Sequence, residues 1–584
     1  MEFQKLQPTV ETINAWFMQE VYLWRTVGSV FWFLACVPVI TSIYILLCNI
    51  SVFHPVTTIV DMLSTLFSAS FLLCVIPILT INGILITYSS RLFTVIPDIG
   101  STRFANLLRL VGVKRLPHVG LFSLCGMITV WCSTTFIGSK YSSLTQSPDG
   151  HIVQLNEHHI FLVVFGLFEG ISYYVKFDLN HFNCLQFPLI QREKFFVFRS
   201  SVCGVFLRML KETIREIKYY YLLYYFFGGA ITSWIAFNLN LQYCKDDVPL
   251  DTIFGLLNFS LLWQVVVLGI YLNFSWSIGH LIFKIYQTEK YEFHIDAVFE
   301  KKKSLHDALN CNKQPLVKYL GYLDLSYLSK CSYERRQQVF CLSQPGGHPH
   351  TWNKISAACL AELNTLNQQI EAANWQAYSN VPVKKTSNIF DKNYTLGETS
   401  EDSMFHRTTN DNISVNKHNG STFSIDTSTE TKPKSIPWKD KLCGVMSKKP
   451  ILGYFMGELP DSKTSQLFCS SQVQIWAVEA LSYLISASYH EDKFGIVQRS
   501  LPVIISSLVN LQENVDKHFK LIAPAQKRHQ KQCSVNYSLL RQELQAVLKS
   551  SIHRIIERFG KHLCDLPLKS ESIKKLKPFV EFKE

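Results

Sequence analysis

The chain has 584 residues, of which 48% are hydrophobic and only 17% are charged, and its formal net charge is +12. Soluble proteins carry about 25% charged residues, so the composition argues against a single soluble globule, and the apolar content argues against full disorder. The 16 Cys residues are scattered and form no CxxC pair, which argues against a secreted disulfide scaffold.

Charge divides the sequence into two parts. Residues 1–283 contain 17 Lys and Arg against 15 Asp and Glu, whereas residues 284–584 contain 40 against 30. The first part is apolar and nearly neutral, and the second is basic and resembles a soluble protein. Together with the length, this division predicts more than one domain.

Six apolar runs in the first part predict six membrane-spanning helices. A hydrocarbon core about 30 Å thick is crossed by about 20 apolar residues in a helix, which pairs every backbone group internally. The runs cover residues 27–48, 62–88, 119–138, 159–175, 219–243 and 252–283. The second and sixth runs are longer than a span requires, so we expect tilt or an interfacial portion there.

Lys and Arg residues alternate between the loops of this predicted domain. The three loops after the first, third and fifth runs contain only Lys140 and Lys245, and the remaining segments contain all the others. The positive-inside rule then places both termini on the cytosol side and three short loops in a lumen or outside the cell. Residues 1–26 contain three Glu, so we expect an uncleaved first span rather than a signal peptide.

Two features of the first part leave alternatives open. Glu169 lies well inside the fourth run, where it is either a proton or ion site with a partner or an acid hydrogen-bonded between helices. Residues 199–218 alternate apolar and basic residues with helical spacing. That stretch is expected either to lie on an anionic leaflet or to pack against the second part of the chain.

The second part is predicted to be mainly helical. Apolar spacing predicts helices over residues 314–330, 333–342, 352–378, 471–489, 495–519 and 537–563. Residues 379–436 are rich in Ser, Thr and Asn, which is typical of a disordered linker. The whole chain is thus divided into an N-terminal segment 1–26, a transmembrane domain 27–283, a juxtamembrane region 284–378, the linker, an amphipathic segment 437–457 and a C-terminal helical domain 458–584.

The amphipathic segment is the candidate site for membrane contact. Its apolar face and the cluster that follows combine Trp with aliphatic and aromatic residues, and Lys residues lie largely off that face. The candidate interfacial residues are Trp438, Leu442, Met446, Leu452 and Phe455. The alternative is that this segment docks on the C-terminal helical domain.

Catalytic, metal and nucleic-acid signatures are missing from the sequence. There is no GxSxG elbow, P-loop or HExxH motif, so we expect no enzyme, no catalytic residue and no cofactor. His348 and His350 lie in a Pro/Gly turn without further ligands nearby, which favours a structural turn over zinc. The basic residues are spread over all the helices and match no nucleic-acid module, so we expect no direct nucleic-acid binding. Since catalytic motifs are missing, we also expect no small-molecule substrate.

Several sequence strings resemble those of the Ndc family of transmembrane nucleoporins. They include Phe187-Pro188-Leu189-Ile190-Gln191, Arg335-Arg336-Gln337-Gln338-Val339-Phe340, the turn Gln344-Pro345-Gly346-Gly347-His348-Pro349-His350, Ile475-Trp476-Ala477 and Glu491-Asp492-Lys493-Phe494-Gly495. The resemblance covers nearly the whole chain and keeps the order of the strings.

This resemblance implies an all-α integral membrane protein that anchors the nuclear pore complex in the nuclear envelope. It implies six spans and support of pore assembly by tethering soluble nucleoporins, including Aladin and inner-ring components. The alternative function is a polytopic transporter or channel with a helical regulatory tail, which a polar partner for Glu169 would favour. A membrane enzyme of unknown type is a third hypothesis.

Overall fold

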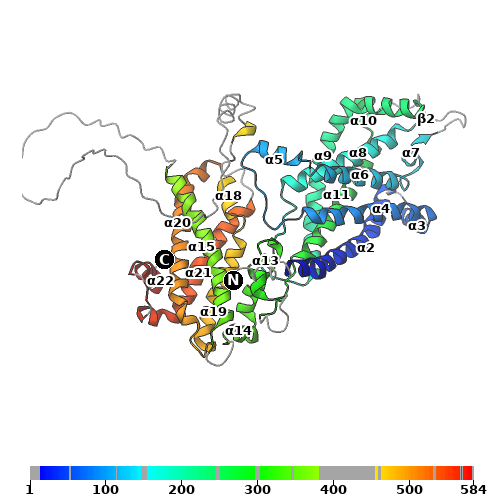
Figure 1. The fold of residues 1–584 in the computed structure, drawn as a ribbon. Coiled ribbons are helices and arrows are strands. Elements are labelled where there is room, and N and C mark those ends of the chain that lie inside the picture. The colour runs from blue at the N-terminus through cyan, green and yellow to red at the C-terminus, as the bar shows by residue number, and fades with distance from the viewer. Residues whose placement is uncertain are drawn as a thin grey trace, which may run out of the picture. The chain divides into compact units, whose positions relative to one another are not determined.

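The computed structural model describes residues 13–50, 54–113, 115–146, 154–243, 250, 252–295, 303–342, 347–379, 454–457, 459, 462–529, 535–565, 567–568 and 570–581. Residues Met1–Asn374 and Glu458–Glu584 form one unit, and Trp375–Gly457 form a second. Nearly all the regular structure is helical (Figure 1). The linker beyond Ser379 and most of the amphipathic segment lie outside the described residues.

Six helices are long and apolar enough to cross a membrane, which confirms the predicted all-α membrane fold. The first continues from a π-helical stretch at Phe17–Tyr22 into α2. The span helices are α2 (Leu23–Cys48), α4 (Ala69–Ser89), α6 (Leu116–Thr134), α8 (Glu157–Leu179), α9 (Lys194–Leu239) and α11 (Phe259–Gln287).

Capping residues set the span boundaries that apolar content alone placed wrongly. The second predicted run is broken, because residues 62–66 belong to a separate helix, α3 (Pro55–Leu66), and Ser68 caps α4 by accepting the Ser70 N–H at 3.3 Å. The sixth span begins at Phe259, where Asn258 accepts the Ser260 N–H at 3.1 Å, and the short α10 (Ile253–Leu256) precedes it.

The fifth span and the amphipathic stretch before it form one continuous helix, α9. Its 46 residues correspond to about 69 Å, more than twice the hydrocarbon thickness of about 30 Å. Residues 199–218 therefore form no separate surface helix. Their buried side chains, Met209, Thr213, Glu216 and Ile217, pack toward α8 and α11 rather than toward the second part of the chain.

The spans bury polar groups and expose apolar ones, which is the reverse of a soluble bundle. Asn82, Glu169 and Asn273 are buried, whereas Leu73 and Phe237 are 73% and 81% exposed. The helices α8 and α11 are the most enclosed, and α6 packs closely against α8. Apolar side chains that face outward are suited to lipid, so the exposed faces mark the hydrocarbon-facing surface.

A small sheet joins two loops of the membrane domain. It consists of β1 (Thr145–Gln146), β2 (Gln154–Leu155) and β3 (Gln242–Tyr243), in the order β1-β2-β3. The pair β1–β2 is antiparallel and the pair β2–β3 is parallel. The strands β1 and β2 follow the short α7 (Ser139–Ser142) in the α6–α8 loop, and β3 follows α9 in the α9–α11 loop. The sheet therefore joins these two loops.

The second part of the chain is the helical region. Its helices are α12 (Leu305–Leu309), α13 (Pro315–Cys331), α14 (Tyr333–Val339), α15 (His350–Ser379), α18 (Ser462–Phe468), α19 (Gln472–Glu491), α20 (Leu501–His529), α21 (Val535–Phe559) and α22 (Ser570–Val580). The predicted start at residue 495 is too early, because Asp492 accepts the N–H groups of Phe494 and Val497 and Gly495 adopts φ 63°. That turn delays α20 to Leu501.

The helix α19 is the centre of the helical region. Twelve of its 20 residues are buried, and it packs against α13 and α21. Figure 1 shows α15, α19, α20 and α21 running alongside one another. A helix that is apolar on nearly all sides is a core helix, so α19 holds the other helices together.

Candidate functional site

The spans and the helical region meet at an aromatic contact. Phe187 lies in the loop between α8 and α9, Tyr319 lies on α13 and Trp476 lies on α19. The Phe187 ring is 5.8 Å from Tyr319 and 5.5 Å from Trp476, measured between centroids. The N–H of Gln191, in the same loop, donates to the Tyr327 hydroxyl at 3.1 Å. We call this contact and its surroundings the junction.

A second loop of the membrane domain also contacts the helical region. The Leu459 N–H donates to the Ser101 carbonyl oxygen at 3.0 Å, and Gln466 Nε2 donates to the Ile99 carbonyl oxygen at 2.7 Å. Both acceptors directly precede α5 (Arg103–Leu110). The C-terminal helices thus hold the loop that connects α4 to α6.

A buried ion pair organises the juxtamembrane helices beside the junction. Asp324 on α13 is 2% exposed and accepts two hydrogen bonds of 2.7 Å from the Arg335 guanidinium on α14. Phe293 donates its N–H to Asp324 at 3.0 Å and accepts from Arg335 at 2.7 Å. Burial raises the pKa of Asp324, and Arg335 opposes that shift. The pair therefore carries a desolvation cost that its hydrogen bonds offset, and it fixes geometry more than it adds stability.

The neighbouring arginine connects the juxtamembrane helices to the C-terminal ones. Arg336 donates from Nε and Nη2 to the Glu491 carboxylate, at 3.0 Å and 2.8 Å. Glu491 is the last residue of α19. This bidentate pair raises the pKa of Arg336, chiefly through the hydrogen bonds to Glu491.

Inside the spans, Glu169 belongs to a closed polar cluster. The side-chain amide of Asn273 on α11 donates to Glu169 on α8, and it lies 3.0 Å from Thr213 Oγ1 and 3.3 Å from Glu216 Oε2 on α9. Glu216 in turn forms an ion pair with Lys176. Glu169 is therefore an acid hydrogen-bonded between helices, as one of the two open interpretations expected.

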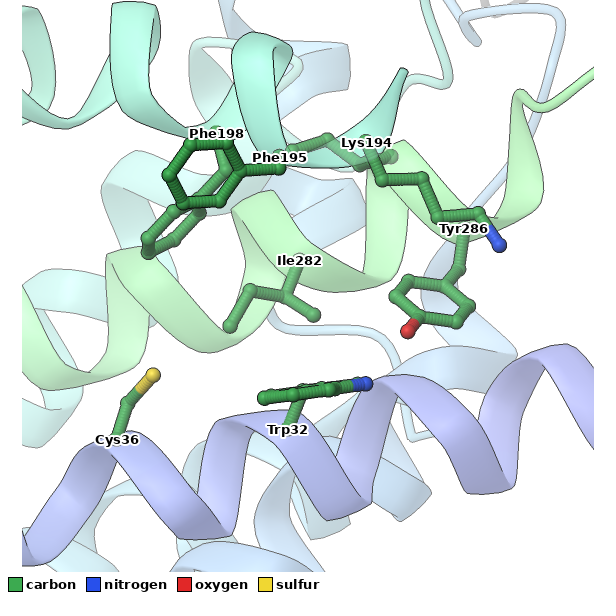
Figure 2. Close-up of a pocket in the computed structure, with 8 residues that line it drawn as sticks. Trp32, Cys36, Lys194, Phe195, Phe198, Ile282 and Tyr286 are labelled. Carbon is green, nitrogen blue, oxygen red and sulfur yellow. The ribbon is translucent and has the colours of Figure 1, made fainter.

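A groove on the lipid-facing side of the spans lies between α2, α9 and α11. It has a volume of about 270 Å³, and its walls are almost entirely apolar. Figure 2 shows Trp32 on α2 facing Ile282 of α11, with Phe195 and Phe198 of α9 above them. At one end, Lys194 Nζ lies 4.4 Å from the centroid of the Tyr286 ring and 2.9 Å from Glu289 Oε2. The groove suits a hydrocarbon chain, with its one cation already paired.

The predicted interfacial residues are only partly described. Phe455 lies in a short helical turn and is 37% exposed. Trp438, Leu442, Met446 and Leu452 lie outside the described residues, so membrane contact by this segment stays a prediction.

The family turn is described from Gly347 onward, and Gln344, Pro345 and Gly346 lie outside the described residues. Pro349 accepts the Asn353 N–H at 3.0 Å, so the turn leads directly into α15, which begins at His350. The rings of His348 and His350 are 6.1 Å apart. Among the residues that the structure describes, no three metal-ligating side chains come together.

Sequence reasoning missed the junction and the ion pairs beside it, although the quoted strings contain several of the residues involved. Phe187, Gln191, Arg335, Arg336 and Glu491 all belong to strings singled out by resemblance. The available signal was that the strings quoted for the resemblance contain polar and aromatic residues that no catalytic motif or apolar helix face explains. Asp324 lay inside a predicted helix and gave no separate signal.

The fold and the junction together define a polytopic helical membrane protein whose spans are joined to a large helical region. The chain matches the family model described as "Nucleoporin protein Ndc1-Nup" over residues 20–577. It is 31% identical to "Nucleoporin NDC1" of Homo sapiens over 96% of this chain and 97% of that protein, and 32% identical to that of Mus musculus with the same coverage. The Danio rerio protein is 31% identical, with 98% and 99% covered. The chain belongs to the Ndc1 family of nucleoporins, which confirms the resemblance.

Proposed function

We propose that this protein anchors the nuclear pore complex in the nuclear envelope and supports pore assembly by tethering soluble nucleoporins. The main support is the hydrophobic cluster around the junction, which we call the junction core. One continuous hydrophobic cluster contains Phe17 of the first span and Phe283 of the sixth together with Leu320 of α13 and Trp476 of α19. A protein bound to the helical region would therefore be held by a structure packed into the spans. This role requires no catalysis, and we propose that the protein is not an enzyme.

Exposed aromatic residues mark a candidate surface for a partner. Tyr333, Tyr489 and Phe494 are 53%, 50% and 62% exposed, and they flank the Arg336–Glu491 pair in sequence. Aromatic residues with a central Arg are typical of the parts of interfaces that carry most binding energy. We propose that a soluble nucleoporin docks here, with Aladin and inner-ring components as the candidates implied by the family.

The orientation completes the proposal. Lys and Arg are concentrated in the segments at the end of the spans that carries the helical region, which supports placing both termini on the cytosol and nucleoplasm side. The helical region would then face the soluble nucleoporins.

The polar cluster around Glu169 is the one observation that favours the alternative, a transporter or channel. Transport sites place ionisable groups at mid-membrane and leave them accessible to substrate. Here Glu169 is fully buried, and Glu216 and Lys176 form an ion pair with each other. The cluster is therefore better explained as an interhelical contact.

The localisation of the tagged full-length protein tests the anchor proposal. We expect a punctate nuclear rim and a membrane fraction that resists extraction by high salt, because six spans cannot be released by weakening surface charge interactions. Diffuse staining of the endoplasmic reticulum or plasma membrane would contradict the proposal. The tagged protein with Phe494→Ala should keep the rim signal, and fewer soluble nucleoporins should be recovered with it.

A further inference from the structure

A basic cleft lies between α8, α9 and α11, close to the end of the spans that carries the helical region. It has a volume of about 90 Å³, which has room for a group the size of several water molecules. Three cations line it, namely Lys176, Arg208 and Lys284, against the single carboxylate of Glu212. Lys284 is one turn from Gln287, where α11 ends.

Two of these cations lack an acidic partner. Lys284 Nζ is 6.0 Å from the Phe93 ring centroid, and Arg208 Cζ is 5.6 Å from that of Phe182. Among the described residues, neither has a carboxylate within 4.0 Å, whereas Lys176 is held by Glu216 and lies 3.5 Å from Glu212. The remaining cleft thus brings together two positive charges, Arg208 and Lys284, that no carboxylate among the described residues neutralises.

Unpaired like charges between helices of a membrane domain are costly, because the surroundings screen them poorly. An anion from outside the protein, bound between these charges, would offset this cost. The cleft lies near the end of the apolar spans, at the level expected for lipid headgroups, and basic pockets between spans are suited to phosphate-containing headgroups. Arg and Lys both form strong charge-assisted hydrogen bonds with phosphate oxygens.

We propose that this cleft binds the phosphate group of an anionic phospholipid, held between Arg208 and Lys284. The lipid comes from the leaflet on the side of the helical region. Lys284 also lies against Phe93 and next to Phe283 of the junction core. Occupancy therefore neutralises the charges directly beneath the junction.

Arg208→Gln is the first test variant, because Arg208 is exposed and its loss should not prevent folding. Lys211→Gln is the matched control, since Lys211 is an exposed cation on the same helix that is outside the cleft lining. Full-length protein in phosphatidylcholine nanodiscs would be titrated with phosphatidic acid, and lipid binding followed by native mass spectrometry. We expect Arg208→Gln to weaken phosphatidic acid binding by about tenfold, as loss of one charge-assisted contact should. We expect Lys211→Gln to leave it unchanged.

Four results would overturn the proposal. Equal losses for both variants would indicate general attraction to the leaflet rather than a site. Equal binding of phosphatidylcholine and phosphatidic acid by the wild-type protein would remove the role of charge. Displacement of the bound lipid by inorganic phosphate at the same concentration would show that the cleft takes the free anion instead. Lys284→Gln, made in parallel, should reproduce the Arg208→Gln defect. Unaltered binding by Arg208→Gln and Lys284→Gln would also refute the site.

Discussion

Asp324 shows how strongly the juxtamembrane region depends on one side chain. Its carboxylate is buried, and its partners come from α14 and from the segment that follows α11 at Phe293, on both sides of α13 in sequence. A buried carboxylate that loses its cation keeps the desolvation cost without the compensating attraction. Loss of Arg335 should therefore destabilise the juxtamembrane region most.

Replacing Arg335 with Met should lower the free energy of unfolding of the helical region by about 3 to 5 kcal/mol, because it leaves the Asp324 charge buried and unpaired. Thermal unfolding of the full-length protein in detergent, followed by circular dichroism, measures this loss. Arg499→Met, on an exposed arginine, is the control and should change little.

A double replacement separates the ion pair from simple packing. Asp324→Leu combined with Arg335→Met should recover part of the lost stability, because no unpaired charge remains, although Phe293 still loses two hydrogen bonds. If Arg335→Met alone has no effect, the pair does not organise the region as we infer.

At the scale of helices, glycine decides how closely α6 and α8 approach. Gly166 and Gly170 are four residues apart on α8 and face Gly126 and Phe122 on α6. A Cβ atom at Gly166 would lie 2.5 Å from Val130 Cγ2 and 2.7 Å from the Gly126 carbonyl oxygen. Small residues at this spacing let the backbones of membrane helices pack in direct contact.

Gly166→Ala should therefore destabilise the membrane domain by about 1 to 3 kcal/mol, although Ala is the better helix former. The measurement is the temperature at which the protein aggregates in detergent. Gly120→Ala on α6 is the matched control, because an added Cβ there would meet no described atom within 4 Å, and it should be neutral or stabilising. Equal behaviour of the two variants would refute the close-packing explanation.

The long helix α9 shows that a change in composition along the chain does not always mark the end of a helix. Charged residues occupy its first half and apolar residues its second, which suggested two elements. The backbone continues through both, since no proline occurs between Pro188 and Pro249 to break the hydrogen-bonded ladder. The helix therefore carries Thr213 and Glu216 into contact with Asn273 in the core of the spans.

At the scale of the whole molecule, the spans and the helical region share one core, so their orientation in the membrane fixes where partners can bind. The distribution of Lys and Arg predicts that this orientation places the helical region on the cytosol side.

We expect a glycosylation sequon inserted after Gln146 to be modified in microsomes and one inserted after Glu581 to remain unmodified, because glycosylation occurs only in the lumen. The mass shift on a gel, removed by a glycosidase, measures each site. A modified site after Glu581 would place the helical region in the lumen and contradict the tethering proposal.

The sequence by itself determined the number of spans, the helical character of the second part and the family. These properties follow from local quantities, namely the length of apolar runs, the spacing of apolar residues and short strings such as Arg335-Arg336-Gln337. Span ends were less predictable, because caps at Ser68 and Asn258 rather than hydropathy set them.

Only the tertiary structure decided the partners of the buried charges and the junction. Glu169 meets Asn273 across 104 residues, and Phe187 meets Trp476 across still more of the chain, so no local pattern encodes either contact. The basic cleft likewise exists only because α9 brings Arg208 beside Lys284 of α11. The hydrophobic driving force scales roughly with the apolar area that local composition supplies, whereas the pairing of buried polar groups depends on which helices pack together.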